Sequence, residues 1–125
     1  MTLRLVVAGM GRNEIKRYAE ETGGDRVQVT AASDMEGARA VLSGQADYYI
    51  GACASGQGGA LSIAIAVLGY PNCQMVSTHG RAPKQEDVKE KVLAGNHKAY
   101  GINHAHAKAI IPPLIEALLE KQRQG

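Results

Sequence analysis

Two apolar runs separated by a glycine-rich loop occupy residues 46–68, and this order strongly constrains what the chain can fold into. The first run, residues 48–52, has the length of a buried strand, and the second, residues 60–68, has the length of a buried helix. A strand that passes through a glycine-rich turn into a helix presents backbone N–H groups to an anion. The segment therefore predicts a parallel α/β unit with a candidate anion site in the loop 53–59.

Four further apolar runs of strand length, each followed by a helical pattern, lie on either side of this unit. These runs are residues 3–8, 27–31, 73–77 and 98–102. Strands that alternate with helices favour a parallel sheet covered on both faces. We therefore expect one α/β domain over residues 1–125, a three-layer αβα sandwich of about five strands in the flavodoxin-like order 2-1-3-4-5.

Polar caps and prolines mark the predicted helix ends. The predicted caps and first helical residues are Asn13, Ser33 with Glu36, Pro83 and Asn103. Pro112 and Pro113 fall inside the last helical pattern and predict that this helix is kinked or split in two.

The balance of charges is close to neutral, with 14 basic and 12 acidic residues and a formal charge of +2 at pH 7. A nucleic-acid-binding surface needs a basic cluster, commonly with aromatic residues among it, and the sequence has none. It also has no apolar run long enough to span a membrane and no secretory segment before the first strand. Together with only two cysteines, these features predict a cytoplasmic protein that binds neither nucleic acid nor membranes.

The predicted loops fall into two classes according to the sheet edge at which they lie. Loops that lead from a helix back to a strand carry a capping glycine and little else, whereas loops that follow a strand carry polar residues. Ligands of open parallel sheets bind at the carboxyl ends of the strands, where the strand order reverses. We therefore predict a site between the loops 9–13 and 53–59. The predicted anion-binding residues are Gly9, Gly11, Arg12, Asn13, Ser55, Gly56, Gln57, Gly58, Gly59 and Arg81.

Three residues of the same edge have side chains suited to proton transfer. A Cys53 thiolate at a helix N-terminus can act as a base or nucleophile, and His79 and His104 can donate or accept a proton. Two structural alternatives remain open at this point. Cys53 can be a small apolar residue at a strand end, and the glycines of the loop can serve a tight turn alone.

Cofactor and metal sites are not predicted. Residues 9–14 begin like a dinucleotide fingerprint, but Glu14 stands where its third glycine belongs. His104 and His106 are two residues apart and lack the i, i+4 spacing of a helical metal pair. We therefore expect neither a bound cofactor nor a metal ion.

The helix expected over residues 60–68 is apolar on all sides. Such a helix is covered either by a second layer of the same chain or by another subunit. A homodimer or higher homo-oligomer is therefore the expected state.

The match of residues 34–70 is specific: the chain resembles the YhfU-like family of uncharacterised small bacterial proteins from its first predicted strand to its last helix, most closely at 34–36, 47–53 and 62–66. The family carries no established activity, but the resemblance implies a cytoplasmic bacterial protein. Residues 53–58 are also similar to the Cys-x-Ser/Thr-Gly-x-Gly loop of type B ribose-5-phosphate isomerases. This second resemblance implies Cys53 as the catalytic base, the backbone of 55–58 as an anion hole, and His79 or His104 as the ring-opening group.

The leading functional hypothesis is the binding of a small phosphorylated or other anionic metabolite at the loop 53–59. One alternative is a sugar-phosphate isomerase that interconverts an aldose and a ketose with Cys53 as base. A second is an oligomeric or regulatory subunit without catalysis.

Overall fold

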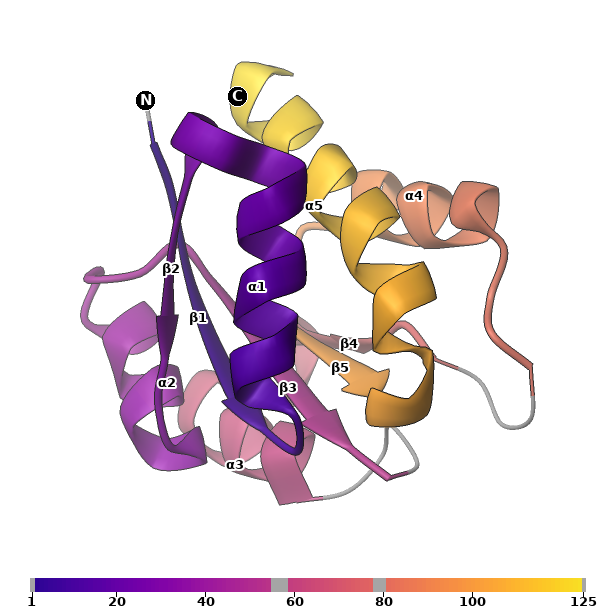
Figure 1. Ribbon diagram of the computed structural model, residues 1–125. Helices are drawn as coiled ribbons and strands as arrows, with labels where there is room; N and C mark the ends of the chain where they lie inside the picture. Colours follow the sequence, from indigo (N-terminus) through magenta and orange to yellow (C-terminus); the bar gives the residue numbers. More distant parts are fainter. Residues whose placement is uncertain (1, 55–58, 78–80, 125) are drawn as a thin grey trace.

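A parallel sheet forms the centre of the computed structural model, which describes residues 2–54, 59–77 and 81–124 (Figure 1). Its strands within these ranges are β1 (Leu3–Gly9), β2 (Val27–Ala31), β3 (Tyr48–Cys53), β4 (Cys73–Met75) and β5 (Ala99–Asn103). Every pairing between neighbouring strands is parallel. The predicted α/β class with a five-stranded parallel sheet is therefore confirmed.

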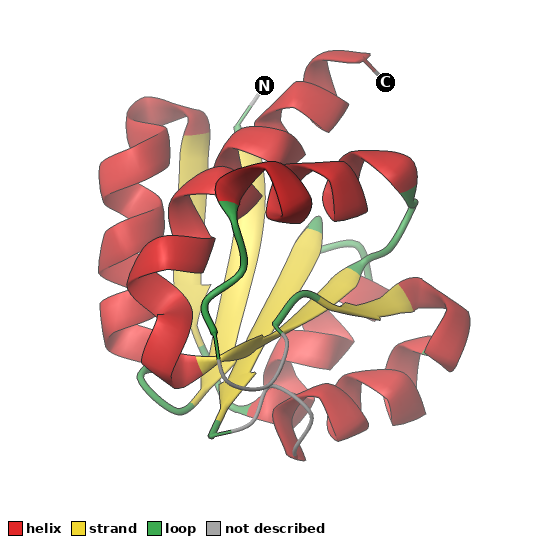
Figure 2. Cartoon of the chain, turned by 90° about the vertical axis from the view of Figure 1, so that its right-hand side faces the viewer, coloured by secondary structure: helices red, strands yellow, loops and turns green. Residues whose placement is uncertain are grey.

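Helices cover both faces of the sheet and complete the three predicted layers (Figures 1 and 2). On one face lie α1 (Arg12–Gly23), α4 (Gln85–Ala94) and α5 (Ala107–Gln124), and on the other lie α2 (Asp34–Leu42) and α3 (Gly59–Leu68). The short 3₁₀ helices are η1 (Gly24–Arg26), η2 (Tyr70–Asn72) and η3 (His104–His106). Each face has its own apolar core, so adjacent tyrosines serve both: Tyr48 packs on the α5 side and Tyr49 on the α3 side.

The strand order is β2-β1-β3-β5-β4, so the predicted order 2-1-3-4-5 is wrong for the last two strands. Burial explains the exchange. Residues 99–102 of β5 are buried throughout, as a central parallel strand requires, whereas all three residues of β4 are half-buried. An edge strand has a neighbouring strand on one side only. A short strand that carries the polar Gln74 is therefore better placed at the edge than in the centre of the sheet.

The observed order places the carboxyl end of β3 between two reversals of chain direction. After β1 and β5 the chain continues into α1 and into η3 with α5 on one face, whereas after β3 it continues into α3 on the other face. Neighbouring connections that leave on opposite faces mark the point at which open parallel sheets bind ligands. The end of β3 therefore lies between two such points.

The helix ends agree with the sequence analysis in part. The Ser33 hydroxyl accepts from the backbone N–H of Glu36 at 3.2 Å and the Glu36 carboxylate accepts from that of Ser33 at 3.3 Å, which confirms the capping box of α2. The N-cap of α1 is Gly11 rather than Asn13, because the chain turns through a left-handed residue there. Helix α4 begins at Gln85, so Pro83 precedes it instead of occupying its first position.

Helix α5 runs through Pro112 and Pro113 without splitting. The prolines lie in the second turn, where they remove only the bonds to the carbonyls of the exposed residues Lys108 and Ala109. Carbonyls on the exposed side of a helix can be hydrated, so the interruption is tolerated. The apolar residues on both sides of the prolines, including Ile111, Leu114 and Leu118, make α5 the largest contributor of any element to the core on this face.

Helix α3 is less covered than its apolar sequence suggests. Leu61 and Ala64 are buried against the sheet and α2, but Ser62 and Ala66 are exposed and the remaining residues from Ile63 to Leu68 are half-buried. The second layer of the chain therefore covers only one side of this helix.

Arg4 and Asp47 join the beginnings of β1 and β3. The Asp47 carboxylate accepts from the backbone N–H of Arg4 at 2.8 Å and from its guanidinium at 3.0 Å, and the Asp47 N–H donates to the Arg4 carbonyl at 2.8 Å. Partial burial raises the pKa of the Asp47 carboxyl, but the hydrogen bonds and charge of Arg4 outweigh this and hold that pKa below its usual value.

Asp47→Asn is expected to lower the free energy of unfolding at neutral pH. It is also expected to make that free energy fall less steeply as the pH is lowered. The native carboxylate stabilises the fold fully above its usual pKa of about 4, and this contribution disappears as the pH falls through the lowered pKa of the folded state. Urea unfolding between about pH 7 and pH 3 measures the effect. Asp25→Asn, at an exposed site, is the control; equal pH profiles for the two variants would contradict the prediction.

Candidate functional site

The turn after β1 lies directly against β3. Gly9 has φ +89°, and a Cβ atom there would lie 2.1 Å from the Ala52 carbonyl oxygen. The next residue, Met10, donates its backbone N–H to the same oxygen at 2.9 Å. Only glycine permits this approach, so the sequence at residue 9 fixes the loop 9–13 beside the end of β3.

Cys53 is the last residue of β3 and is half-buried. It pairs in register with Asn103, the last residue of β5, while the preceding Ala52 pairs with Gly9. The predicted base therefore lies between the two reversals of chain direction described above. Cys73, by contrast, begins β4 at the opposite sheet edge, where burial raises the pKa of its thiol, and neither cysteine is in a disulfide bond.

His104, directly after β5, packs against the β1 turn although β3 lies between these two strands. Gly11 has φ +70°, and a Cβ atom there would lie 2.2 Å from Cδ2 and 2.3 Å from Nε2 of the His104 ring. The ring thus packs on the bare backbone of Gly11. The Nε2 atom of His104 lies 3.6 Å from the Glu14 carboxylate, and 34% of the His104 side chain is exposed. The structure therefore brings two of the predicted residues, Gly11 and His104, into contact.

Two polar residues hold the ends of β4 and β5 together. The Ser77 hydroxyl, which is buried, accepts from the backbone N–H of Asn103 at 2.6 Å, and the Asn103 side chain accepts from the N–H of Ala105 at 2.9 Å. Asn103 is therefore the predicted cap, and it directs the chain into η3 with His104. The role of Ser77 was not predicted, although a lone serine directly after an apolar strand is a signal for it.

Arg12 and Asn13 lie in the first turn of α1, and both are exposed. The Arg12 guanidinium donates to the Ala32 carbonyl at 2.9 Å, beyond the end of β2. Hydrogen bonds with Ser33 lower the pKa of the Glu36 carboxyl, and the charge of Arg12 contributes further. Arg12 therefore lies over the β2 side of the carboxyl edge, and its predicted anion contact stays a prediction.

Several of the predicted site residues fall outside the described ranges. Ser55, Gly56, Gln57, Gly58 and His79 are in this group. Gly59 is the first residue of α3, and Arg81 is exposed on the segment that leads to α4. Their predicted roles in anion binding or proton transfer stay predictions.

Two further features are absent from the described part of the chain. Its His, Cys, Asp and Glu residues form no group of three or more that could hold a metal ion. No helix within the same residues is long and apolar enough to cross a membrane.

Comparison with known sequences identifies the family. The uncharacterized protein YhfU of Escherichia coli strain K12 is 43% identical over 115 residues, which cover 92% of this chain and 97% of that protein. YhfU of Shigella flexneri matches to the same extent. The family model described as protein of unknown function DUF2620 matches residues 3–118. The chain belongs to the DUF2620 family. The resemblance to YhfU-like proteins is thereby confirmed.

Solved structures similar to this DUF2620 chain include type B ribose-5-phosphate isomerases. The enzyme from Trypanosoma cruzi aligns with a TM-score of 0.69 at 14% identity and covers 94% of this chain and 84% of its own. The enzyme from Thermotoga maritima aligns with a TM-score of 0.67 at 13% identity, with coverage of 95% and 87%. At this level of identity the likeness establishes a shared fold, in agreement with the local resemblance in residues 53–58.

Gly11→Ala is expected to destabilise the fold by about 2–4 kcal/mol, since it combines left-handed strain with an overlap at the His104 ring. Gly44→Ala is a matched control, because Gly44 has φ +83° but open space around its Cβ position. It measures the strain alone, about 1–2 kcal/mol. Urea unfolding gives both values.

Replacing His104 with alanine is expected to remove the excess cost of Gly11→Ala over Gly44→Ala, because the overlapping ring is then absent. A double-mutant cycle measures this coupling. Equal costs for the two glycine variants in the native background, or an excess that persists without the His104 ring, would refute the contact.

Proposed function

We propose that this protein binds a small phosphorylated or other anionic metabolite at the carboxyl edge of β1, β3 and β5. The observation that carries the proposal is the convergence of three segments: the glycine turn after β1, Cys53 at the end of β3, and Asn103 with His104 after β5. The N-terminus of α3 at Gly59 is suited to negative charge. We expect the protein to act in the cytoplasm.

An isomerase activity on a sugar phosphate is the second candidate, and the order of the strands favours it. Cys53 is the last residue of β3, and His104 directly follows the adjacent strand β5. Cys53 pairs in register with Asn103, the residue before His104. A base and a proton-transfer group on neighbouring strand ends are what aldose–ketose isomerisation requires. Solved proteins of this fold are named as ribose 5-phosphate isomerases, which supports the substrate class.

The proposed reaction conserves all atoms of the sugar. His104, or His79 in its place, moves a proton between the ring oxygen and the hydroxyl at C1, and the ring opens to the aldehyde. The Cys53 thiolate takes the proton from C2, and the electrons of that C–H bond move toward the C1 oxygen to give an enediolate. The same thiol returns that proton to C1, the hydroxyl proton on the C2 oxygen moves to the C1 oxygen, and the C2 oxygen becomes the carbonyl of the ketose. Backbone N–H groups of the loop 55–59 stabilise the enediolate charge.

Ribose 5-phosphate and inorganic phosphate are the probes that test both candidates. We expect each to shift amide resonances of residues 9–13 and 103–106 in a ¹H–¹⁵N NMR titration, because these segments line the proposed site. Amide shifts confined to other parts of the chain, or none at millimolar probe, would overturn the binding proposal.

Cys53→Ala separates binding from catalysis. Loss of a catalytic base is expected to reduce the turnover of ribose 5-phosphate by about 10²–10⁴-fold while leaving its affinity within about threefold. Cys73→Ala, at the opposite sheet edge, is the control and is expected to keep full activity. Turnover that survives in Cys53→Ala excludes the thiol as base, and binding without any turnover in the native protein supports the subunit or regulator alternative.

We further propose that two copies associate through the outer side of α3. This side presents the exposed Ala66 beside the half-buried Ile63 and Val67, and the exposed Tyr70 follows it. A run of this composition that the chain covers on only one side is typical of a subunit contact.

Ala66→Glu is expected to convert the dimer into a monomer, because it sets a charge in the contact without disturbing the buried side of α3. Sedimentation equilibrium measures the mass, and Ala109→Glu on the exposed side of α5 is the matched control. A native protein that sediments as a monomer would exclude this contact.

A further inference from the structure

A pocket lies at the amino edge of the sheet, where the strands begin. Its volume is about 840 Å³, which is within the range of small-molecule sites. One wall comes from residues at or just before the beginnings of β1, β3 and β5, and the other from residues 121–124 at the end of α5. Figures 1 and 2 show the end of α5 and the start of β1 at the same end of the molecule. This amino-edge pocket is therefore opposite the site proposed above.

Three cationic side chains line the amino-edge pocket: Lys98, Lys121 and Arg123. None of them forms an ion pair with a carboxylate of the described residues. Asp47 is the acidic residue of the lining, and its carboxylate is bonded to Arg4, which brings a further positive charge. The lining is therefore net positive even with Asp47 counted.

Contacts within the protein fix where two of these cations lie. Lys121 Nζ donates to the Gly95 carbonyl at 2.6 Å and keeps its other N–H groups for further acceptors. Lys98 Nζ lies 5.6 Å from the centre of the Tyr48 ring, and the backbone N–H and C=O of Lys98 are both bonded to neighbouring segments. Cations that are already placed lose less conformational freedom when an anion binds.

The positive charge of the pocket exceeds the field that opposes it. The C-terminus of α5 carries about half an elementary negative charge, and three full positive charges outweigh it. The whole chain has a formal charge of only +2, so these cations are a local concentration and not the general charge of the surface. A hollow lined by one sign of charge attracts ions of the opposite sign.

The remaining lining residues supply apolar surface and hydrogen-bond donors. Leu3 is buried and Tyr48 is half-buried, so the walls formed by β1 and β3 are partly apolar. The side-chain amides of Asn96, Gln122 and Gln124 can each donate hydrogen bonds. The pocket thus combines cations and N–H donors, the groups that carboxylates and phosphates require.

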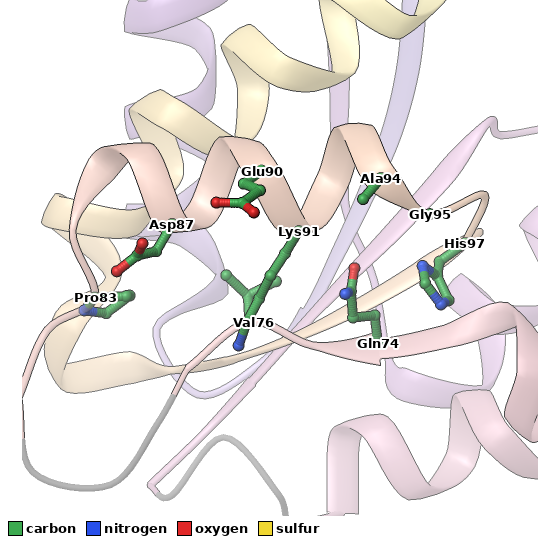
Figure 3. A pocket seen from close by; sticks show the side chains of 9 residues that line it. All are labelled: Gln74, Val76, Pro83, Asp87, Glu90, Lys91, Ala94, Gly95 and His97. Carbon is green, nitrogen blue, oxygen red and sulfur yellow. The ribbon is translucent and has the colours of Figure 1, made fainter.

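A second pocket, between α4 and β4, has the opposite charge (Figure 3). Asp87 and Glu90 line it, and Lys91 is the lysine or arginine among its lining residues in the described chain. Its formal charge is therefore net negative. An anion is expected to distinguish the two pockets by charge alone, which makes the pocket of Figure 3 an internal control.

We propose that the amino-edge pocket binds a small anion that carries two or more negative charges on carboxylates or phosphates. Lys98, Lys121 and Arg123 balance its charge, and the amides of the lining donate to its remaining oxygens. A single negative charge would leave most of the cations unmatched, so the pocket favours a multivalent anion. It shares no residue with the carboxyl-edge site, so it stands whether or not a metabolite binds there.

Citrate, pyrophosphate and acetate are the probes for a ¹H–¹⁵N NMR titration of the whole chain at low salt. We expect citrate and pyrophosphate to shift the amides of residues 47–48, 96–98 and 121–124, acetate to bind at least tenfold more weakly, and residues 85–94 to stay unchanged. A response to only one of the multivalent anions supports the site and identifies the group it takes. Acetate binding as tightly as citrate, or no shift with either multivalent anion at millimolar concentration, would overturn the proposal.

Removal of two of the cations tests their role directly. The double variant Lys98→Gln/Arg123→Gln is expected to weaken binding of the responding anion at least tenfold and to reduce its dependence on salt. Both residues are exposed, so folding is not expected to change. The matched control is Lys84→Gln/Lys108→Gln, which removes the same charge at exposed sites outside both pockets. Equal losses in the two double variants would refute a specific site.

Arg123→Glu provides a second measurement through a single change at the end of α5. Reversal of one charge is expected to weaken anion binding more than Arg123→Gln does, because the new carboxylate repels the ligand. Thermal unfolding measured alongside shows that the variant is folded. Equal affinities of Arg123→Glu and the native protein would contradict the proposal.

Discussion

The approach of the Gly9 backbone to the Ala52 carbonyl is the contact on which the carboxyl edge depends. Any side chain at residue 9 would overlap that oxygen, and the N–H of Met10 is bonded to it. The turn after β1 is therefore held against the end of β3. This places Gly11 where the His104 ring packs on it. Backbone geometry at Gly9 thereby joins the ends of β1 and β3, and the packing of the His104 ring on Gly11 adds the end of β5.

Much of the architecture follows from local pattern. Five apolar runs alternate with helical segments, and this alternation was enough to predict a parallel sheet covered on both faces. The capping box at Ser33 and Glu36 was also predictable, because it is set by residues three apart in the sequence. The positive φ of Gly11 could not be predicted in this way. It makes Gly11 the N-cap, so α1 begins before the expected cap Asn13.

The order of β4 and β5 could not be taken from local pattern, and the arrangement of the site depends on it. Residues 73–77 and 98–102 have similar lengths, and only their burial in the folded protein separates an edge strand from a central one. In the expected order the segment after β4 would follow next to Cys53, and His104 would be two strands away, about 10 Å. The observed order places Asn103, with His104 after it, next to the end of β3, so local pattern groups the polar strand ends on one edge but does not give their order along it. His97 precedes β5 at the opposite edge, and the pocket that it lines exists only in the folded chain, because its other walls come from β4 and α4.

The three-residue length of β4 has a consequence for the behaviour of the protein in a crowded solution. Asn72 and Val76 bond toward β5, so alternation leaves only Cys73 and Met75 to present backbone groups outward at this edge. Such a short edge is a poor template for the strand of another molecule. Had β5 formed the edge, five residues of apolar, β-forming sequence would have been open to pairing. The exchange of the last two strands thus encloses the longer and more deeply buried β5 and leaves the short β4 at the edge.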